Sequence, residues 1–177
     1  MKLHYALFAG LLALSACAPP PPPAAPAPAP VSLPKPVVPA AQPTRPAGDW
    51  PDWPLAAGDW VYRRDDRGSL ALFGPAGQNA TVTLRCDTTR RRIFLARAGA
   101  GPAGRIVVRS SSTMKEFAGS PTGATPPYLA TEILPTDPIL DAMAFSRGRI
   151  ALEVDGQPSI AIPSWAEITR IVEDCRG

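Results

Sequence analysis

The sequence from residue 48 to 177 predicts a mainly β domain of the α+β class, with about seven or eight antiparallel strands and two short helices. Short apolar runs are separated by turn residues, several runs alternate with a period of two, and two segments carry helix-start signals. Such a set of strands closes into a sandwich or a half-open barrel, so these two architectures are the expectation.

Strand patterns follow one another along this region. Between 80 and 86, Val82, Leu84 and Cys86 fall on one face and polar residues on the other. The loop 74–79 separates this segment from the apolar run 70–73, which predicts a β-hairpin. Asp155-Gly156 predicts a second hairpin, between 150–154 and 160–162. The other expected strands are 60–64, 93–96, 106–108, 110–118 and 128–134.

Two helices are expected near the end of the chain. Asp137 followed by Pro138 is a typical helix start, with Asp as the N-cap and Pro at the first helical position. Ser164 and Glu167 have the spacing of a capping box for the second helix. Apolar residues then recur at helical spacing as far as Cys175, which predicts one buried face.

Three tryptophans, Trp50, Trp53 and Trp60, lie close together at the start of this domain. Because each indole offers a large apolar area, we expect them to pack as a lid over one end of the core. The alternative interpretation is an exposed aromatic strip that binds glycan.

The first sixteen residues read as a targeting signal. A short positive head containing Lys2 precedes an apolar run from Tyr5 to Ala16. That run is too short for a bilayer core, which needs about 20 apolar residues, but it suits a secretory signal.

The run ends in Leu14-Ser15-Ala16-Cys17, which resembles the lipobox of bacterial lipoprotein precursors. The resemblance implies cleavage between Ala16 and Cys17 and a diacylglycerol on the Cys17 sulfur. It also implies anchoring to a membrane outside the cytoplasm. Ala18 resembles the pattern sorted to the outer membrane, which implies the leaflet facing the periplasm. An ordinary secreted protein cut near Ala16 is the alternative.

Residues 17–47 then form the lipidated cysteine and a Pro/Ala-rich tether. Thirteen of the 24 prolines lie between Pro19 and Pro46. Because proline fixes φ and removes a backbone donor, polyproline II is the expected state. About thirty residues in that state reach on the order of 90 Å. A spacer is therefore favoured over a Pro-rich ligand for another protein.

Cys86 and Cys175 are the two cysteines left once Cys17 is assigned to lipid. Thiols outside the cytoplasm tend to be oxidised, and both residues fall on the inner face of their expected elements. A disulfide between them is expected, and two unpaired buried thiols are the alternative.

The chemistry open to the mature chain is narrow, because its single histidine, His4, leaves with the signal. Ser-His-Asp and Cys-His mechanisms and the usual zinc sites need imidazole or free thiols, so we expect no metal, cofactor or catalytic residue. Ser112 and Lys115 match the Ser-x-x-Lys string of penicillin-binding proteins, but the companion motifs are missing. No pair stands out among the acidic candidates, which are Asp65, Asp66, Glu116, Glu132, Asp137, Asp141 and Glu153.

Arg147 and Arg149 flank a glycine between a predicted helix and a predicted strand. The two arginines are candidates for binding an anionic group or a partner. The interpretation favoured by sequence is a turn that is salt-bridged to Asp141 or Glu153.

Charge argues against a nucleic-acid partner. From Trp50 onward 15 basic residues face 14 acidic ones, and the one dense basic cluster is 90–92. The function expected is therefore a non-catalytic binding or scaffold domain of an envelope lipoprotein, with an envelope protein or the cell wall as partner and an undetermined oligomeric state. The alternatives are an inhibitor of an envelope-targeting hydrolase such as lysozyme and a carboxylate-based cell-wall enzyme.

Overall fold

The computed structural model describes residues 44–177. The predicted signal peptide, the cleavage site at Ala16, the lipidation site Cys17 and the tether as far as residue 43 lie outside the described residues. The described elements are η1 (Trp50–Asp52), β1 (Asp59–Asp65), β2 (Gly68–Gly74), β3 (Val82–Asp87), β4 (Arg92–Ala98), β5 (Gly104–Arg109), β6 (Met114–Pro121), β7 (Tyr128–Ile133), α1 (Pro138–Ala144), β8 (Arg149–Val154), β9 (Ile160–Pro163) and α2 (Ala166–Arg176).

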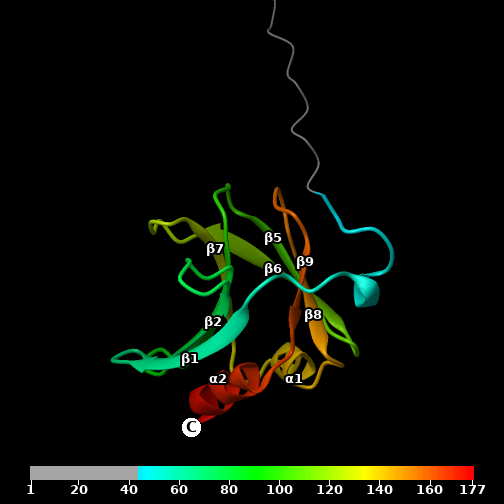
Figure 1. Cartoon of the computed structure of the whole chain (residues 1–177). Helices are drawn as coiled ribbons and strands as arrows, with labels where there is room; N and C mark the ends of the chain where they lie inside the picture. Colours follow the sequence, from blue (N-terminus) through cyan, green and yellow to red (C-terminus); the bar gives the residue numbers. More distant parts are fainter. Residues whose placement is uncertain (1–43) are drawn as a thin grey trace, which may run out of the picture. The chain divides into compact units, whose positions relative to one another are not determined.

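The nine strands form one antiparallel sheet that curves into a half-barrel (Figure 1). The strand order is β1-β2-β3-β4-β7-β6-β5-β8-β9. β6 joins the two halves, because residues 114–119 pair with β5 while Ser120 and Pro121 pair with β7. The predicted mainly β class and the half-open barrel are confirmed, with nine strands in place of seven or eight.

Alternation along the strands decides which face of the sheet is buried. Val82, Leu84 and Cys86 are fully buried on the inner face of β3, as their period of two predicts. β2 shows the same alternation and pairs with β3 along the predicted hairpin. Burying this many aliphatic side chains contributes on the order of 25 cal/mol for each Å² of apolar surface removed from water.

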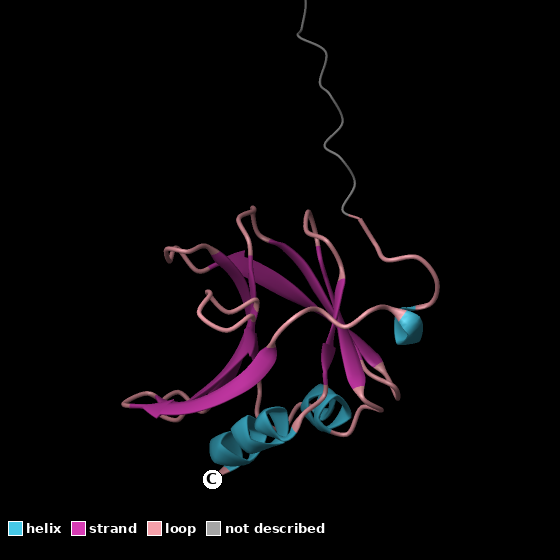
Figure 2. Ribbon diagram, viewed as in Figure 1, coloured by secondary structure: helices cyan, strands magenta, loops and turns pink. Residues whose placement is uncertain are grey.

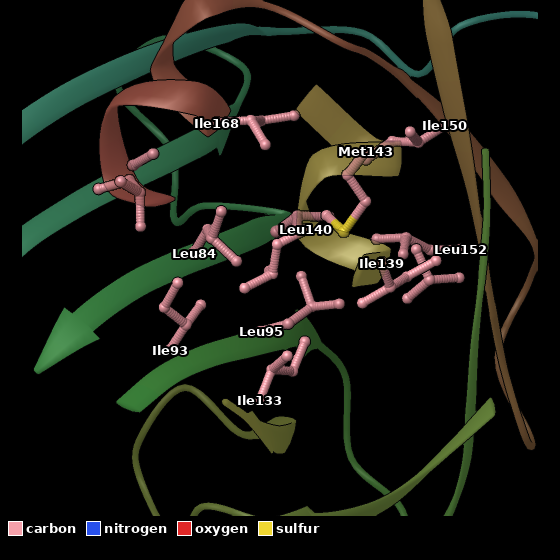
Figure 3. Packing of buried hydrophobic residues seen from close by; sticks show 14 of the residues in the cluster. Leu84, Ile93, Leu95, Ile133, Ile139, Leu140, Met143, Ile150, Leu152 and Ile168 are labelled. Atoms are coloured by element: carbon pink, nitrogen blue, oxygen red, sulfur yellow. The ribbon is translucent and has the colours of Figure 1, made fainter. Parts of the chain in front are cut away.

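Both helices pack at the same end of the half-barrel, against the inner face of the sheet (Figure 2). Figure 3 shows Leu140 and Met143 of α1 within the same cluster of buried side chains as Leu84 and Leu95 from the strands. The α1 N-cap is the predicted one, since the Asp137 carboxylate accepts a hydrogen bond from the backbone N–H at residue 139. Pro138 occupies the first turn, where its missing N–H costs nothing.

The capping box predicted for α2 is wrong. The N-cap is Trp165 and makes no side-chain cap hydrogen bond. Ser164 instead donates its hydroxyl to the carbonyl groups of Met143 and Ala144, 2.6 and 3.2 Å away at the end of α1. The hydroxyl therefore joins the start of α2 to the end of α1, in place of the local bond that a capping box would make.

The three tryptophans do not form a single lid. Trp60 is buried in the main core, with its ring centroid 5.4 Å from that of Phe73. Trp53 is 1% exposed but packs with Trp50 against Ala151 and Ala161, which form a separate cluster. The neighbours of these two alanines in β8 and β9 belong to the main core, so Trp53 covers the opposite, outer face of the sheet.

The outermost strands, β1 and β9, are joined across the open side of the half-barrel. The Trp60 indole donates to the carbonyl of Pro163 at 2.9 Å. Leu55 forms a parallel bridge with Ala161, and Ala56 N–H donates to the Ala161 carbonyl at 2.8 Å. These bonds occupy part of the β9 edge, which would otherwise present unpaired backbone groups.

Residues 44–53, which we call the strap, lie along β8 and its turn into β9. Ser159 N–H donates to the Thr44 carbonyl at 3.2 Å, and the Arg45 guanidinium pairs with Glu153. Arg45 also lies 5.8 Å from the centroid of the Trp53 ring. The last residues of the predicted tether thus contact the folded domain.

The predicted disulfide between Cys86 and Cys175 is confirmed, with Cα atoms 5.4 Å apart. It links β3 to α2 across 89 positions of sequence. A disulfide is consistent with an oxidising compartment outside the cytoplasm. Within residues 44–177, no helix has both the length and the apolar character needed to cross a bilayer.

Candidate ligand-binding site

Three loops come together beside the helix ends and form a surface that we call the rim, made of residues 110–113, 145–148 and 164–165. Serine hydroxyls connect them. Ser146 accepts a hydrogen bond from Ser111 N–H at 2.9 Å, and the Ser111 hydroxyl accepts one from Arg147 N–H at 3.1 Å. Ser164 ties the third loop to the end of α1 and donates its own N–H to Gly148. The rim is therefore held by tertiary hydrogen bonds, although each loop is short.

The rim carries two exposed aromatic side chains and one arginine without an ion-pair partner in the described part of the chain. Phe145, directly after α1, is 77% exposed, and Trp165, directly before α2, is 44% exposed. Arg147 is exposed, and its guanidinium forms no ion pair with any other residue of the range 44–177. No acidic residue occurs in the three loops, so nothing within the rim offsets this charge.

The two arginines predicted as a possible anion site do not act together. Arg149 donates its guanidinium to the backbone carbonyl of Trp53, and only Arg147 faces solvent with its charge unpaired. The predicted salt bridges are wrong, because Asp141 pairs with Arg176 and Glu153 pairs with two other arginines. Arg149 is half-buried, and its guanidinium binds this carbonyl instead of a carboxylate near the turn.

Four carboxylates in the described part of the chain have lowered pKa values. A paired hydrogen bond from Arg85 lowers the pKa of Asp65 to about 2, and backbone and arginine donors lower the pKa of Asp87. Burial opposes ionisation of Glu153 and Asp174, but hydrogen bonds from neighbouring side chains outweigh it and lower both pKa values. A glycosidase-type proton donor needs a raised pKa, so these four groups suit structural ion pairs.

The Ser-x-x-Lys string does not form the geometry of the enzymes it resembles. Ser112 lies in the turn between β5 and β6, and Lys115 lies on β6, where its ammonium group pairs with Asp137. A strand and a turn do not place the two side chains on one helical face. Among residues 44–177, no group of three or more His, Cys, Asp or Glu side chains is placed to hold a metal ion.

Trp165 is the rim residue that sequence reasoning missed. Its neighbours Ser164 and Glu167 predict a capping box, which marks Trp165 only as part of a helix start. Twenty positions separate it from Phe145, and no periodic signal links the two. The bonds from Ser164 to the end of α1 and to Gly148 bring both residues to one surface.

Chemically, the rim is suited to an anionic ligand that has apolar faces. A guanidinium binds a carboxylate through a rigid fork of donors, and aromatic rings cover flat C–H surfaces such as those of sugars. In searches of known proteins, neither a family model nor a curated sequence nor a solved structure matches this chain.

Proposed function

We propose that this protein is a lipoprotein anchored through Cys17, whose domain binds the cell wall on the periplasmic side of the outer membrane without cleaving it. The lipobox resemblance supports the anchor, and the Cys86–Cys175 disulfide supports an oxidising compartment. The Pro/Ala-rich segment suits a spacer between membrane and domain.

The observation that carries the binding proposal is the unpaired charge of Arg147 on a rim with Phe145 and Trp165. Arginine and aromatic residues dominate the energetics of binding surfaces, because they combine a large contact area with specific hydrogen bonding. The wall polymer offers sugar rings together with carboxylates, and these match the two kinds of side chain. The hydrogen-bonded loops fix the rim before binding, which reduces the entropy lost on association.

The test is cosedimentation of the mature protein with purified, insoluble cell wall. Arg147→Ala and Trp165→Ala are each expected to weaken retention roughly tenfold, since losing one central residue of a binding surface costs about 1–2 kcal/mol. Arg63→Ala is the matched control, because Arg63 is also exposed and unpaired within residues 44–177 but lies on β1. Retention that is absent, or that is unaffected by both rim variants, contradicts the proposal.

The same assay separates the alternatives. Soluble wall fragments released by the domain alone would indicate an enzyme. Slower digestion of the wall by added lysozyme, with no retention of the domain, would favour the inhibitor alternative.

A further inference from the structure

A second surface, which shares no residue with the rim, is a groove of about 480 Å³ beside the disulfide. We call it the arginine groove. Its walls come from three elements that are distant in sequence: the start of β4, the loop between β7 and α1, and the end of α2. The lining residues are Arg91, Arg92, Leu134, Pro135, Thr136 and Arg176.

The disulfide fixes the two sides of this groove relative to each other. Cys86 pairs with Ile93 in the sheet, and Cys175 directly precedes Arg176. The covalent bond between them therefore sets the end of α2 beside the β3–β4 turn that carries Arg91. A groove with fixed walls loses little conformational entropy when it is filled.

The groove has an excess of positive charge. Arg92 pairs with Glu132, which also binds Arg90, and Arg176 makes a bidentate pair with Asp141. Three arginines at or beside the groove thus pair with only two carboxylates, and Arg91 adds a fourth positive charge. The Arg91 guanidinium has no ion-pair partner within residues 44–177, so the excess is concentrated at the turn.

Arg91 also has an unusual backbone conformation, with φ of +50°. Residues with a side chain rarely adopt this left-handed region, and glycine is the ordinary choice at such a turn. The turn keeps an exposed arginine where glycine would be less strained. Strain of this kind clusters at binding sites, and here it adds a second observation to the unpaired charge.

Leu134 and Pro135 form the apolar part of the groove lining, which we call the floor, and no lining residue is aromatic. Leu134 is 52% exposed, and Pro135 lies beside it with its carbonyl bound by the Arg176 guanidinium. An aliphatic floor suits an aliphatic side chain better than a sugar ring. We infer that the arginine groove binds an acidic peptide segment of a partner protein, with carboxylates on Arg91 and an apolar side chain on Leu134.

This inference is independent of wall binding, since the two surfaces share no residue. Taken together, the sites would let one anchored domain hold the wall at the rim and a protein at the groove. The occupant is a peptide of acidic and aliphatic residues, because its carboxylates match the positive charge of Arg91 and its apolar side chains match the surface of Leu134.

The experiment measures fluorescence anisotropy of a short labelled peptide of alternating glutamate and leucine, titrated with the mature protein. Saturation below about 1 mM is expected, with binding that weakens as salt is raised. Arg91→Gly and Leu134→Ser are each expected to weaken binding roughly tenfold. Glycine suits the φ at position 91, so this variant removes the guanidinium without endangering the fold.

Two controls make the result decisive. The same peptide with glutamine in place of glutamate should bind at least about tenfold more weakly. Trp165→Ala should leave peptide binding unchanged, just as Arg91→Gly should leave wall retention unchanged. The inference is overturned if the peptide fails to saturate, if both peptides bind equally, or if Arg91→Gly has no effect.

Discussion

The indole N–H of Trp60 donates to the carbonyl of Pro163 at 2.9 Å and so joins the first strand of the sheet to the last. Both groups are buried, and the two residues are 103 positions apart in sequence. Trp60→Phe keeps an aromatic ring beside Phe73 but leaves the carbonyl without this donor. The free energy of unfolding should fall by about 1–3 kcal/mol, measured by urea denaturation. Trp165→Phe, at an exposed position, should change it by less than about 0.5 kcal/mol.

The disulfide should contribute much of the stability of the domain. In the chain-entropy description, a loop of this length stabilises by about 4–5 kcal/mol. Replacing Cys86 and Cys175 together by alanine should lower the free energy of unfolding by that order. Peptide mapping of native protein without reductant should recover both cysteines in one linked peptide. Two thiols open to alkylation in native material would contradict the bond.

Most substitutions lower the free energy of unfolding, but the left-handed backbone of Arg91 predicts that replacing this residue by glycine raises it. Arg91→Gly should raise the free energy of unfolding by about 1 kcal/mol, because glycine adopts positive φ without steric cost. Arg91→Ala removes the same charge but keeps the Cβ, so it should give no such gain. Equal thermal shifts in the two variants would show that charge, and not the backbone, is responsible.

The free energy of unfolding should depend on pH through the carboxylate of Asp65. Its pKa in the folded protein is about 2, against 3.8 for the ordinary group, owing chiefly to the Arg85 hydrogen bonds. A lowered pKa stabilises the fold above the unfolded value, and this contribution is lost as pH falls through the folded value. Asp65→Asn should therefore flatten the decline of stability between about pH 4 and pH 2. Asp66→Asn is the control, because Asp66 forms no ion pair within residues 44–177.

The anchor proposal is tested by Cys17→Ala. Without the sulfur, no diacylglycerol can be attached, and the protein should leave the membrane fraction. Two or more acyl chains hold a protein almost irreversibly, so wild-type protein should stay with the membranes after a high-salt wash. A variant that still sediments with membranes would show that something other than lipid anchors the chain.

Local patterns predicted the fold well, and long-range contacts explain what they missed. The alternation of Val82, Leu84 and Cys86 identified the buried face, because a period of two is a property of any strand. Asp137 identified a helix start for an equally local reason. The acceptors of Ser164 and Arg149 lie on elements that only the assembled sheet and helices bring near, and no local pattern encodes them.

The candidate site was predicted in part. Arg147 was singled out as a possible anion-binding residue, and it is the rim arginine whose charge is unpaired. Its relation to Trp165 could not be predicted, because the two loops are brought together by tertiary contacts between the helix ends. The salt bridges predicted for the turn 145–149 do not form, because Asp141 and Glu153 pair with other arginines in the tertiary structure.

The strap is the first part of the domain to bear a pulling force applied to the chain at its N-terminal side. A pull applied at Thr44 reaches the Ser159 hydrogen bond and the Arg45–Glu153 pair before it reaches any hydrogen bond of the sheet. Peeling the chain further would next strain the buried Trp53 ring, and only then the Leu55 bridge at the β9 edge. Tension that enters the domain at residue 44 therefore breaks these peripheral contacts first, before it reaches the core and the disulfide.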